Sequence, residues 1–213
     1  MLHGLFITFE GSEACGKTTQ IARLALRLAE IGRPPLVTRE PGGTEAGESI
    51  RDLLQYSKKG RNLTSEAELL LFAASRAQLV REVIRPALAE GKIVISDRFM
   101  DSTTVYQGVA RRIDPSQVGF INRFAVGDCL PALTFLFDLD PKMAAARLAA
   151  RAGDKPDRME SQPPAFYEAV REGYLALARQ EKERFVLIDA AQSVEDIAAV
   201  IWERISEKLN PQC

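Results

Sequence analysis

Short apolar runs alternate along the chain with longer stretches in which apolar residues recur every three or four positions. The short runs are continuously apolar, as in strands that are covered on both faces, and the longer stretches are typical of amphipathic helices. The predicted strands cover residues 5–10, 35–38, 93–97, 134–138 and 185–189. The predicted helices cover residues 17–31, 64–90, 102–111, 115–126, 141–150, 164–183 and 194–209. This alternation predicts an α/β fold with a five-stranded parallel sheet and helices on both of its faces.

Proline residues refine the helix boundaries. Pro115, Pro141 and Pro164 each stand where a first helical turn tolerates proline. Pro86 lies inside a predicted helix and should kink it or break its last turn. Residues 151–164 mix Gly, Pro, Asp, Lys and Arg between two helices, and we predict a mobile loop there rather than a domain boundary.

Composition limits what the chain binds. Hydrophobic residues make up 46% and charged residues 27% of its 213 residues, and the formal net charge is −1. These values fit one soluble domain, residues 1–213, and favour neither nucleic acid nor a membrane as a partner. The N-terminus has no signal-peptide pattern, no run reaches the roughly 20 apolar residues of a membrane span, and Cys15, Cys129 and Cys213 have no zinc or disulfide spacing. We therefore expect a cytoplasmic protein.

Residues 11–18 read GSEACGKT and match the phosphate-loop pattern GxxxxGK[ST]. They follow a predicted strand and open a predicted helix, which is the context that the pattern requires. The glycines let backbone N–H groups point at phosphate oxygens, and the helix N-terminus adds partial positive charge. Lys17 would reach the β- and γ-phosphates of a nucleotide, and Thr18 would offer its hydroxyl to Mg²⁺. The residues expected to bind ATP in this segment are Gly11, Ser12, Glu13, Ala14, Cys15, Gly16, Lys17, Thr18 and Thr19.

Two further strand ends carry charged residues. Asp97 ends the predicted strand 93–97 and is followed by Arg98, while Arg39 follows the second strand. Because the carboxyl ends of parallel strands share one edge, Asp97 is expected beside the phosphate loop, where it would act through Mg²⁺ or its waters. Arg98 and Arg39 suit a second phosphate, since guanidinium groups hold phosphate oxygens in pairs. Two anion sites indicate phosphoryl transfer to an acceptor that is itself a phosphate ester. The guanine-reading NKxD pattern does not occur, which disfavours a GTPase.

The chain resembles the thymidylate kinase family over nearly its whole length. The segments that carry the resemblance are FEGSEACGKTTQ (9–20), TREPGGT (38–44), LLFAASRAQ (70–78), DRFMDSTTVYQG (97–108) and DRME (157–160). The second and fourth are specific to this family among monophosphate kinases. The resemblance implies a phosphate-loop NTPase-type fold with a small lid at about residues 147–160. It also implies Mg²⁺-assisted transfer of the γ-phosphate of ATP to dTMP, giving dTDP for dTTP synthesis, and a homodimer.

The same resemblance implies how the nucleoside of dTMP is bound. Phe72 would stack on thymine and Arg76 would hydrogen-bond its carbonyl edge, and a spacing of four places both side chains on one helix face. Thr103 would lie near the base. Tyr106 would lie beneath the sugar, where its ring would crowd a 2′-hydroxyl, and Gln107 would join this wall. Without the family, plain core packing is the alternative role for Phe72.

Phosphate chemistry is implied in the same way. Arg39 and Arg98 would hold the acceptor phosphate, and Glu13 matches the acidic position that touches the acceptor's 3′-hydroxyl, which would explain a carboxylate among phosphates. No general base is required, because the acceptor phosphate is already ionised near pH 7. Catalysis is then positioning and charge neutralisation by Lys17, Arg98 and Asp97.

One arginine is expected from the lid. Some family members carry an arginine in the phosphate loop at the position that is Ala14 here. The lid region contains Arg147, Arg151, Lys155 and Arg158, and resembles the family branch in which the lid donates the arginine. We expect Arg151 to reach the donor phosphates as a catalytic residue, with Arg147 in support. A solvated basic loop is the alternative.

Several alternatives remain open from the sequence. A kinase for another nucleoside monophosphate, or for a nucleoside, would share the phosphate loop and differ at Arg39, Arg76 and Tyr106. A nucleotide-binding switch without transferase activity would need a guanine motif and a partner-sensing loop, and neither is found. Cys15 could sense redox state at a helix N-terminus or be a small residue that fits the loop. The apolar stretch 63–79 could form a dimer interface or belong to the core.

Overall fold

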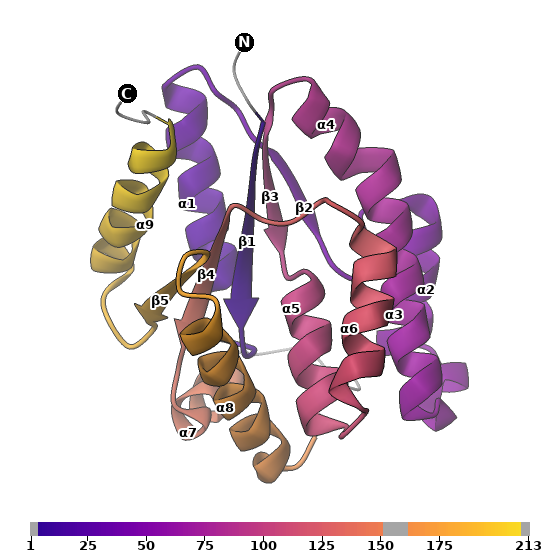
Figure 1. The fold of residues 1–213 in the computed structure, drawn as a ribbon. Coiled ribbons are helices and arrows are strands. Elements are labelled where there is room, and N and C mark those ends of the chain that lie inside the picture. The colour runs from indigo at the N-terminus through magenta and orange to yellow at the C-terminus, as the bar shows by residue number, and fades with distance from the viewer. Residues whose placement is uncertain (1–3, 151–161, 210–213) are drawn as a thin grey trace.

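The computed structural model describes residues 4–150 and 162–209. Five strands form a single sheet: β1 (Leu5–Gly11), β2 (Leu36–Arg39), β3 (Ile93–Asp97), β4 (Leu133–Asp138) and β5 (Phe185–Asp189). Their order is β2-β3-β1-β4-β5, and each neighbouring pair is parallel (Figure 1). The predicted fold class is confirmed, and each predicted strand is present with boundaries within one residue.

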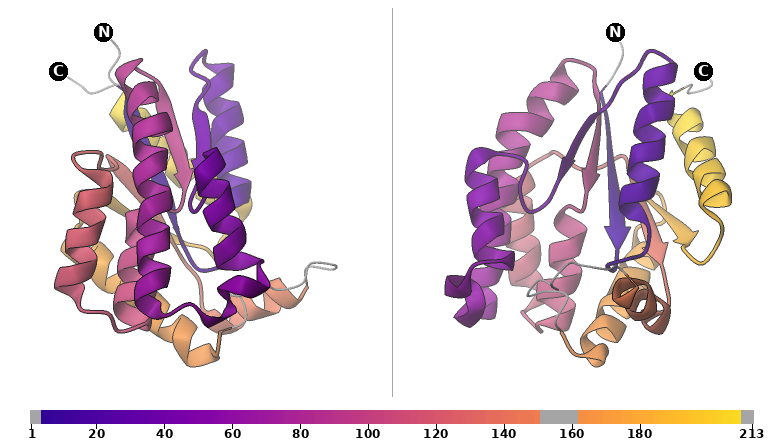
Figure 2. Two further views of the ribbon diagram at one scale, coloured as in Figure 1. Left: turned by 90° about the vertical axis from the view of Figure 1, so that its right-hand side faces the viewer. Right: turned by 180° about the vertical axis from the view of Figure 1, so that it is seen from behind.

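Helices cover both faces of the sheet (Figures 1 and 2). On one face, α1 (Lys17–Glu30) and α9 (Val194–Leu209) bury Leu28 and Ile201 against strand residues such as Ile7. The other face is covered by α3 (Ser65–Leu79), α4 (Arg85–Ala89), α6 (Pro115–Val126) and α8 (Pro164–Gln180). Phe6, the neighbour of Ile7, packs on this second face. Adjacent strand residues thus point to opposite apolar layers, which explains why the strands are continuously apolar.

Residues 45–62 were not predicted to be helical, and this was wrong. They form α2 (Glu45–Gln55) and a short 3₁₀ helix, η1 (Lys58–Asn62). The hydroxyl of Thr44 caps α2 by accepting from the N–H of Gly47, and acidic Glu45 and Glu48 lie in its first turn. Only Gly47 and Leu54 of α2 are buried, so the apolar face is too narrow to give a clear helical pattern.

The long helix predicted over residues 64–90 is divided by a wide turn. It comprises α3, the π-helical turn η2 (Val80–Ile84) and α4, and the N–H of Arg85 donates to Val80 O five residues back. The irregularity lies one turn ahead of Pro86, which has no N–H to continue the α-helical ladder and whose ring crowds the preceding turn.

The helix predicted over residues 102–111 also differs. It begins two residues earlier as α5 (Met100–Thr103) and continues as a second π-helical segment, η3 (Thr104–Ala110). A period of 3.6 residues does not describe such a segment, so the sequence pattern located the helix without its type. Wide turns of this kind often lie at functional sites, and η3 contains Tyr106 and Gln107.

The predicted lid is only partly described. Residues 147–149 lie on α7 (Pro141–Ala149), Ala150 caps it, and residues 151–161 lie outside the described residues. The helix predicted over 164–183 is α8, which ends three residues earlier. Within residues 4–150 and 162–209, no helix has the length and apolarity needed to cross a bilayer.

Candidate active site

The phosphate loop connects β1 to α1 at the carboxyl edge of the sheet. Gly11 and Gly16 have φ values of +133° and +99°, which residues with a side chain rarely adopt. A Cβ on Gly11 would also lie 2.5 Å from the carbonyl oxygen of Phe137, so only glycine fits there. The loop lines a cavity of about 210 Å³ whose other walls come from the ends of β2 and β3 and from α2.

Lys17 and Thr18 begin α1 beside this cavity. Lys17 is 7% exposed, and its Nζ donates to Ser12 O at 2.7 Å and to Gly11 O at 3.1 Å. Its ammonium group is therefore held inside the loop by carbonyl oxygens. The hydroxyl of Thr18 donates to Asp97 Oδ2 at 3.4 Å, which brings together the two oxygen donors predicted for Mg²⁺.

Arg98 and Glu13 form an ion pair within the site. Arg98 Nη2 donates to Glu13 Oε1 at 2.7 Å, and the guanidinium lies over the ring of Tyr106. Burial opposes ionisation of Glu13, but the charges of Arg98 and Lys17 prevail and hold the pKa of its carboxyl below the ordinary value. Glu13 is thus a carboxylate whose charge is balanced by two cations, which explains how it is tolerated beside a phosphate site.

Arg39 lines the same cavity, but its guanidinium has a partner. Its Nη2 donates to both carboxylate oxygens of Glu48 at 2.8 Å. Glu48 also accepts from the N–H of Gly43, and this bond and the neighbouring Arg39 lower the pKa of its carboxyl.

Arg51 on α2 is a further cation that the sequence analysis missed. It lines the cavity and donates to Pro41 O at 3.0 Å. The signal that could have found it is the cap at Thr44 with acids in the first turn, which marks a helix start.

A second, smaller cavity of about 50 Å³ adjoins the first and is lined by the residues predicted to bind the nucleoside. They are Phe72, Arg76, Thr103, Tyr106 and Gln107. They come from α3, α5 and η3, so the fold gathers residues separated by up to 35 positions. Glu13 and Arg98 line this cavity as well, which connects it to the phosphate loop.

Arg76 is held rigidly at the bottom of this smaller cavity, with 1% of its surface exposed. Its Nε donates to Glu40 at 2.8 Å, Nη1 to Asn122 at 2.8 Å and Nη2 to Thr103 at 2.6 Å. Within the described part of the chain, three of its five N–H groups have partners, which leaves two for a ligand. Sequence spacing suggested the position of Arg76 but not its partners.

Tyr106 and Gln107 form the wall beside Arg98. The hydroxyl of Tyr106 donates to Glu13 Oε2 at 3.2 Å, and Gln107 Nε2 donates to Glu68 at 2.8 Å. Both side chains are almost fully buried. The tyrosine ring is therefore fixed in the wall of the smaller cavity, next to Glu13 and Arg98, which line both cavities.

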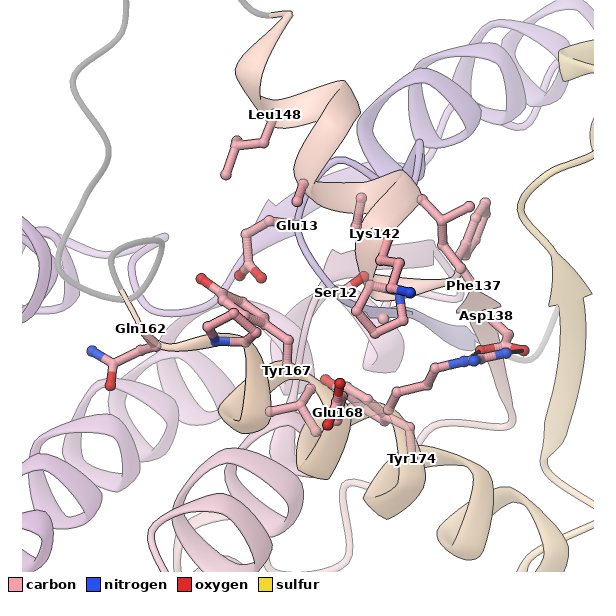
Figure 3. A pocket seen from close by; sticks show the side chains of 18 of the residues that line it. Ser12, Glu13, Phe137, Asp138, Lys142, Leu148, Gln162, Tyr167, Glu168 and Tyr174 are labelled. Carbon is pink, nitrogen blue, oxygen red and sulfur yellow. Dashed lines mark hydrogen bonds and ion pairs between the residues drawn. The ribbon is translucent and has the colours of Figure 1, made fainter.

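A larger cavity of about 990 Å³ opens on the other side of the loop. Figure 3 shows Ser12 and Glu13 entering it from the loop, Lys142 from α7, and Tyr167 and Tyr174 from α8. The space is large enough for a nucleotide-sized molecule. Neither tyrosine was among the site residues predicted from the sequence.

Of the cations predicted for the lid, only Arg147 is among the described residues. Arg151, Lys155 and Arg158 lie outside the described residues. Arg147 is on α7 and its Nη2 donates to Ala190 O at 3.1 Å, just beyond the end of β5.

Cys15 is buried in the phosphate loop, and its sulfur lies 3.5 Å from Lys17 Nζ. A redox sensor must be reached by oxidants from solvent, so the burial of Cys15 favours a packing role.

Metal binding would depend on few protein groups. Among residues 4–150 and 162–209, no three His, Cys, Asp or Glu side chains gather as a metal site. The hydroxyl of Thr18 and the carboxylate of Asp97 are nevertheless hard oxygen ligands of the kind that Mg²⁺ uses when phosphates and water supply the rest.

Comparison with known proteins identifies close relatives. The family model described as thymidylate kinase matches residues 9–201. A thymidylate kinase of Desulfosudis oleivorans is 50% identical over 91% of this chain and 92% of its own. That of Syntrophotalea carbinolica is 46% identical over 96% of both chains. A crystal structure of thymidylate kinase from Ehrlichia chaffeensis matches with a TM-score of 0.76 and 35% identity, covering 95% of this chain and 99% of its own.

The buried pair of Glu40 and Arg76 predicts an unusual pH dependence of stability. Burial outweighs the attraction of Arg76 and raises the pKa of Glu40 to about 7, against 4.5 for the free side chain. Ionisation of Glu40 is thus less favourable in the folded state, and its contribution to stability falls by up to about 3 kcal/mol as the pH rises from 4.5 to above 7. Relative to Glu40→Gln, the wild type should therefore lose thermal stability over this range.

The measurement is the melting temperature of both proteins at intervals from pH 5 to pH 8, with substitution of the exposed Glu66 by Gln as the control. The prediction would be contradicted if the melting temperatures of the two proteins changed in parallel with pH. It would also be contradicted if the melting temperature of the wild type rose relative to that of Glu40→Gln as the pH increased.

Proposed function

The chain belongs to the thymidylate kinase family, and from this premise we propose which of its residues carry the reaction. As a member of the family it transfers the γ-phosphate of ATP to dTMP and forms dTDP, a step of dTTP synthesis. One observation carries the proposal. The phosphate loop and the smaller cavity lined by Arg76 lie side by side at one edge of the sheet, and Arg39, Arg51 and Arg98 line the space at the loop.

The donor is ATP, held by its phosphates in the loop. Backbone N–H groups of residues 11–19 surround the β- and γ-phosphates, and Lys17 exchanges its two carbonyl partners for phosphate oxygens. Thr18 and Asp97 would hold Mg²⁺, which neutralises charge on the phosphates when bound. Arg151 is proposed to reach the donor phosphates from the lid, with Arg147 in support.

The acceptor phosphate lies against Arg98, Arg39 and Arg51. Arg98 is the central group because it is largely buried and already oriented by Glu13. Arg39 is half exposed and paired with Glu48, so it would turn from that carboxylate to the phosphate at modest cost. These cations bring two anions together, and the acceptor oxygen, already ionised, attacks without a general base.

The nucleoside occupies the smaller cavity, which must widen to admit it. Phe72 stacks on thymine, and the two free N–H groups of Arg76 face its carbonyl edge. The oxygen of Thr103, which accepts from Arg76, lies near the base. Tyr106 and Gln107 close the sugar side of the cavity, and because the ring of Tyr106 lies there a 2′-hydroxyl has no room. Glu13 accepts a hydrogen bond from the 3′-hydroxyl.

These roles predict acceptor specificity. With ATP and Mg²⁺, dTMP should be preferred over dUMP, UMP, CMP, AMP and GMP, and free thymidine should not be phosphorylated. Removing the ring in Tyr106→Ala should raise kcat/KM for the ribose form of thymidine monophosphate, relative to dTMP, by about tenfold or more. Tyr106→Phe keeps the ring and should keep the discrimination.

A coupled assay of ADP formation measures each acceptor. Preference for another monophosphate would retain the kinase and remove the roles of Arg76, Thr103 and Tyr106. Turnover of thymidine would contradict the two-anion site. Binding of ATP without transfer to any acceptor would favour a nucleotide-binding switch.

We also propose that two copies of the chain associate through α3 and α6. Phe120 and Phe124 are 65% and 75% exposed and lie four residues apart on α6, which packs against α3, the helix that carries the exposed Leu70. A clustered apolar surface of this kind is typical of an interface, and identical chains supply identical patches.

We also propose a cytoplasmic location, because the two described cysteines are free and buried.

Phe124→Lys should convert the dimer to a monomer, because it places a charge in the centre of the apolar face. Analytical ultracentrifugation measures the change, and Leu26→Lys serves as the control, since Leu26 is similarly exposed on α1 at the other side of the sheet. A wild type that is monomeric at all concentrations, or dissociation by the control alone, would contradict the proposal.

A further inference from the structure

A second group of polar side chains contacts Arg98 behind its ion pair with Glu13. Arg98 Nη1 donates to Ser102 Oγ at 3.2 Å and to the hydroxyl of Tyr174 at 3.4 Å. These two hydroxyls in turn donate to Glu10 Oε2, at 2.6 Å from Ser102 and 2.8 Å from Tyr174. Two hydroxyl groups therefore stand between the guanidinium and a second carboxylate.

Glu10 anchors this arrangement. It is fully buried near the end of β1, and its Oε1 accepts from the N–H of Phe99 at 2.8 Å and of Ser102 at 3.3 Å. Two backbone donors and two hydroxyl donors fix the carboxylate in one orientation. Its bonds also fix the turn that carries Arg98, whose φ of +69° is unfavourable for a residue with a side chain.

The arrangement leaves part of Arg98 available to a ligand. Two N–H groups are occupied by the hydroxyls and one by Glu13. On its other side the guanidinium lines both the smaller cavity and the phosphate-loop cavity, beside the ring of Tyr106. A guanidinium held on one side and open to a cavity on the other loses little freedom when it binds a phosphate.

We propose that Glu10, Ser102 and Tyr174 are positioning residues that orient Arg98 for the acceptor phosphate, with Tyr174 linking α8 to that clamp. The inference rests on the proposed contact between Arg98 and the acceptor phosphate. Glu10 lines none of the three cavities, so it acts through Arg98 rather than on the substrate. The effect is therefore specific to the phosphate of dTMP and absent for its nucleoside.

Tyr174→Phe tests this directly. It removes the hydroxyl and keeps the ring, which packs against Tyr106 with centroids 6.3 Å apart. By calorimetry, the affinity for dTMP should fall roughly tenfold while the affinity for thymidine stays within about twofold. The KM for dTMP should rise with an unchanged KM for ATP. Glu10→Gln keeps the shape of the side chain and should shift dTMP binding in the same direction.

Phe166→Leu is the matched control, because Phe166 lies on the same helix and in the same apolar cluster as Tyr174. It should lower the melting temperature and leave the ratio of dTMP to thymidine affinity unchanged. Equal losses for dTMP and thymidine in Tyr174→Phe, or no loss at all, would overturn the proposal.

Arg98→Ala separates this inference from the role of Arg98 itself. That substitution should abolish most of the advantage of dTMP over thymidine, and adding Tyr174→Phe to it should cause no further loss. A further loss in the double variant would mean that Tyr174 contacts the ligand directly and would overturn the positioning role. If Arg98→Ala leaves the advantage intact, the proposed acceptor-phosphate contact fails and the positioning role with it.

Discussion

The parallel register of β1, β3 and β2 is the constraint on which the site depends. It aligns Phe9 and Arg39 with Asp97, so β2 and β3 end at one level, two residues before the end of β1. The N–H of Arg98 donates to Phe9 O and the N–H of Glu40 to Asp97 O, both at 2.9 Å, which continues the alignment past the strand ends. The phosphate loop, the Arg98 turn and the turn after β2 therefore face one space. A slip of one residue would turn these side chains to the opposite face of the sheet.

Buried charge gives this space its chemistry. Burial opposes the ionisation of Glu13 and Glu40 alike, yet the pKa of Glu13 is lowered and that of Glu40 is raised. The difference lies in their neighbours. Glu13 faces two cations, Arg98 and Lys17, whereas Glu40 faces Arg76 together with two other buried carboxylates, Glu10 and Asp101. A buried ion pair adds little net stability after desolvation, so such networks are better understood as holding side chains in one geometry. Here they orient the two arginines that the proposed mechanism needs most.

The sequence predicted the sheet and the position of the phosphate loop, because each has a local signal. Strands such as 93–97 are continuously apolar, and the loop has fixed spacing. Phe72, Arg76, Thr103 and Tyr106 came from family resemblance, and the structure gathers them around one cavity. What was missed depends on contacts distant in sequence. Helix α2 buries too narrow a face to be recognised, and Arg51 was missed with it. The partners of Arg76, from Glu40 to Asn122, and those of Arg98, from Glu13 to Tyr174, exist only once the chain has folded.

The central claim is that the donor and acceptor phosphates meet between the loop and Arg98. A single molecule that joins adenosine to thymidine through a chain of phosphates tests it most directly, because both ends would bind at once. Calorimetric titration should give one molecule per chain and an affinity at least about a hundredfold above that of ATP or dTMP alone. An affinity no better than that of ATP, with dTMP still able to bind, would place the acceptor elsewhere and contradict the account.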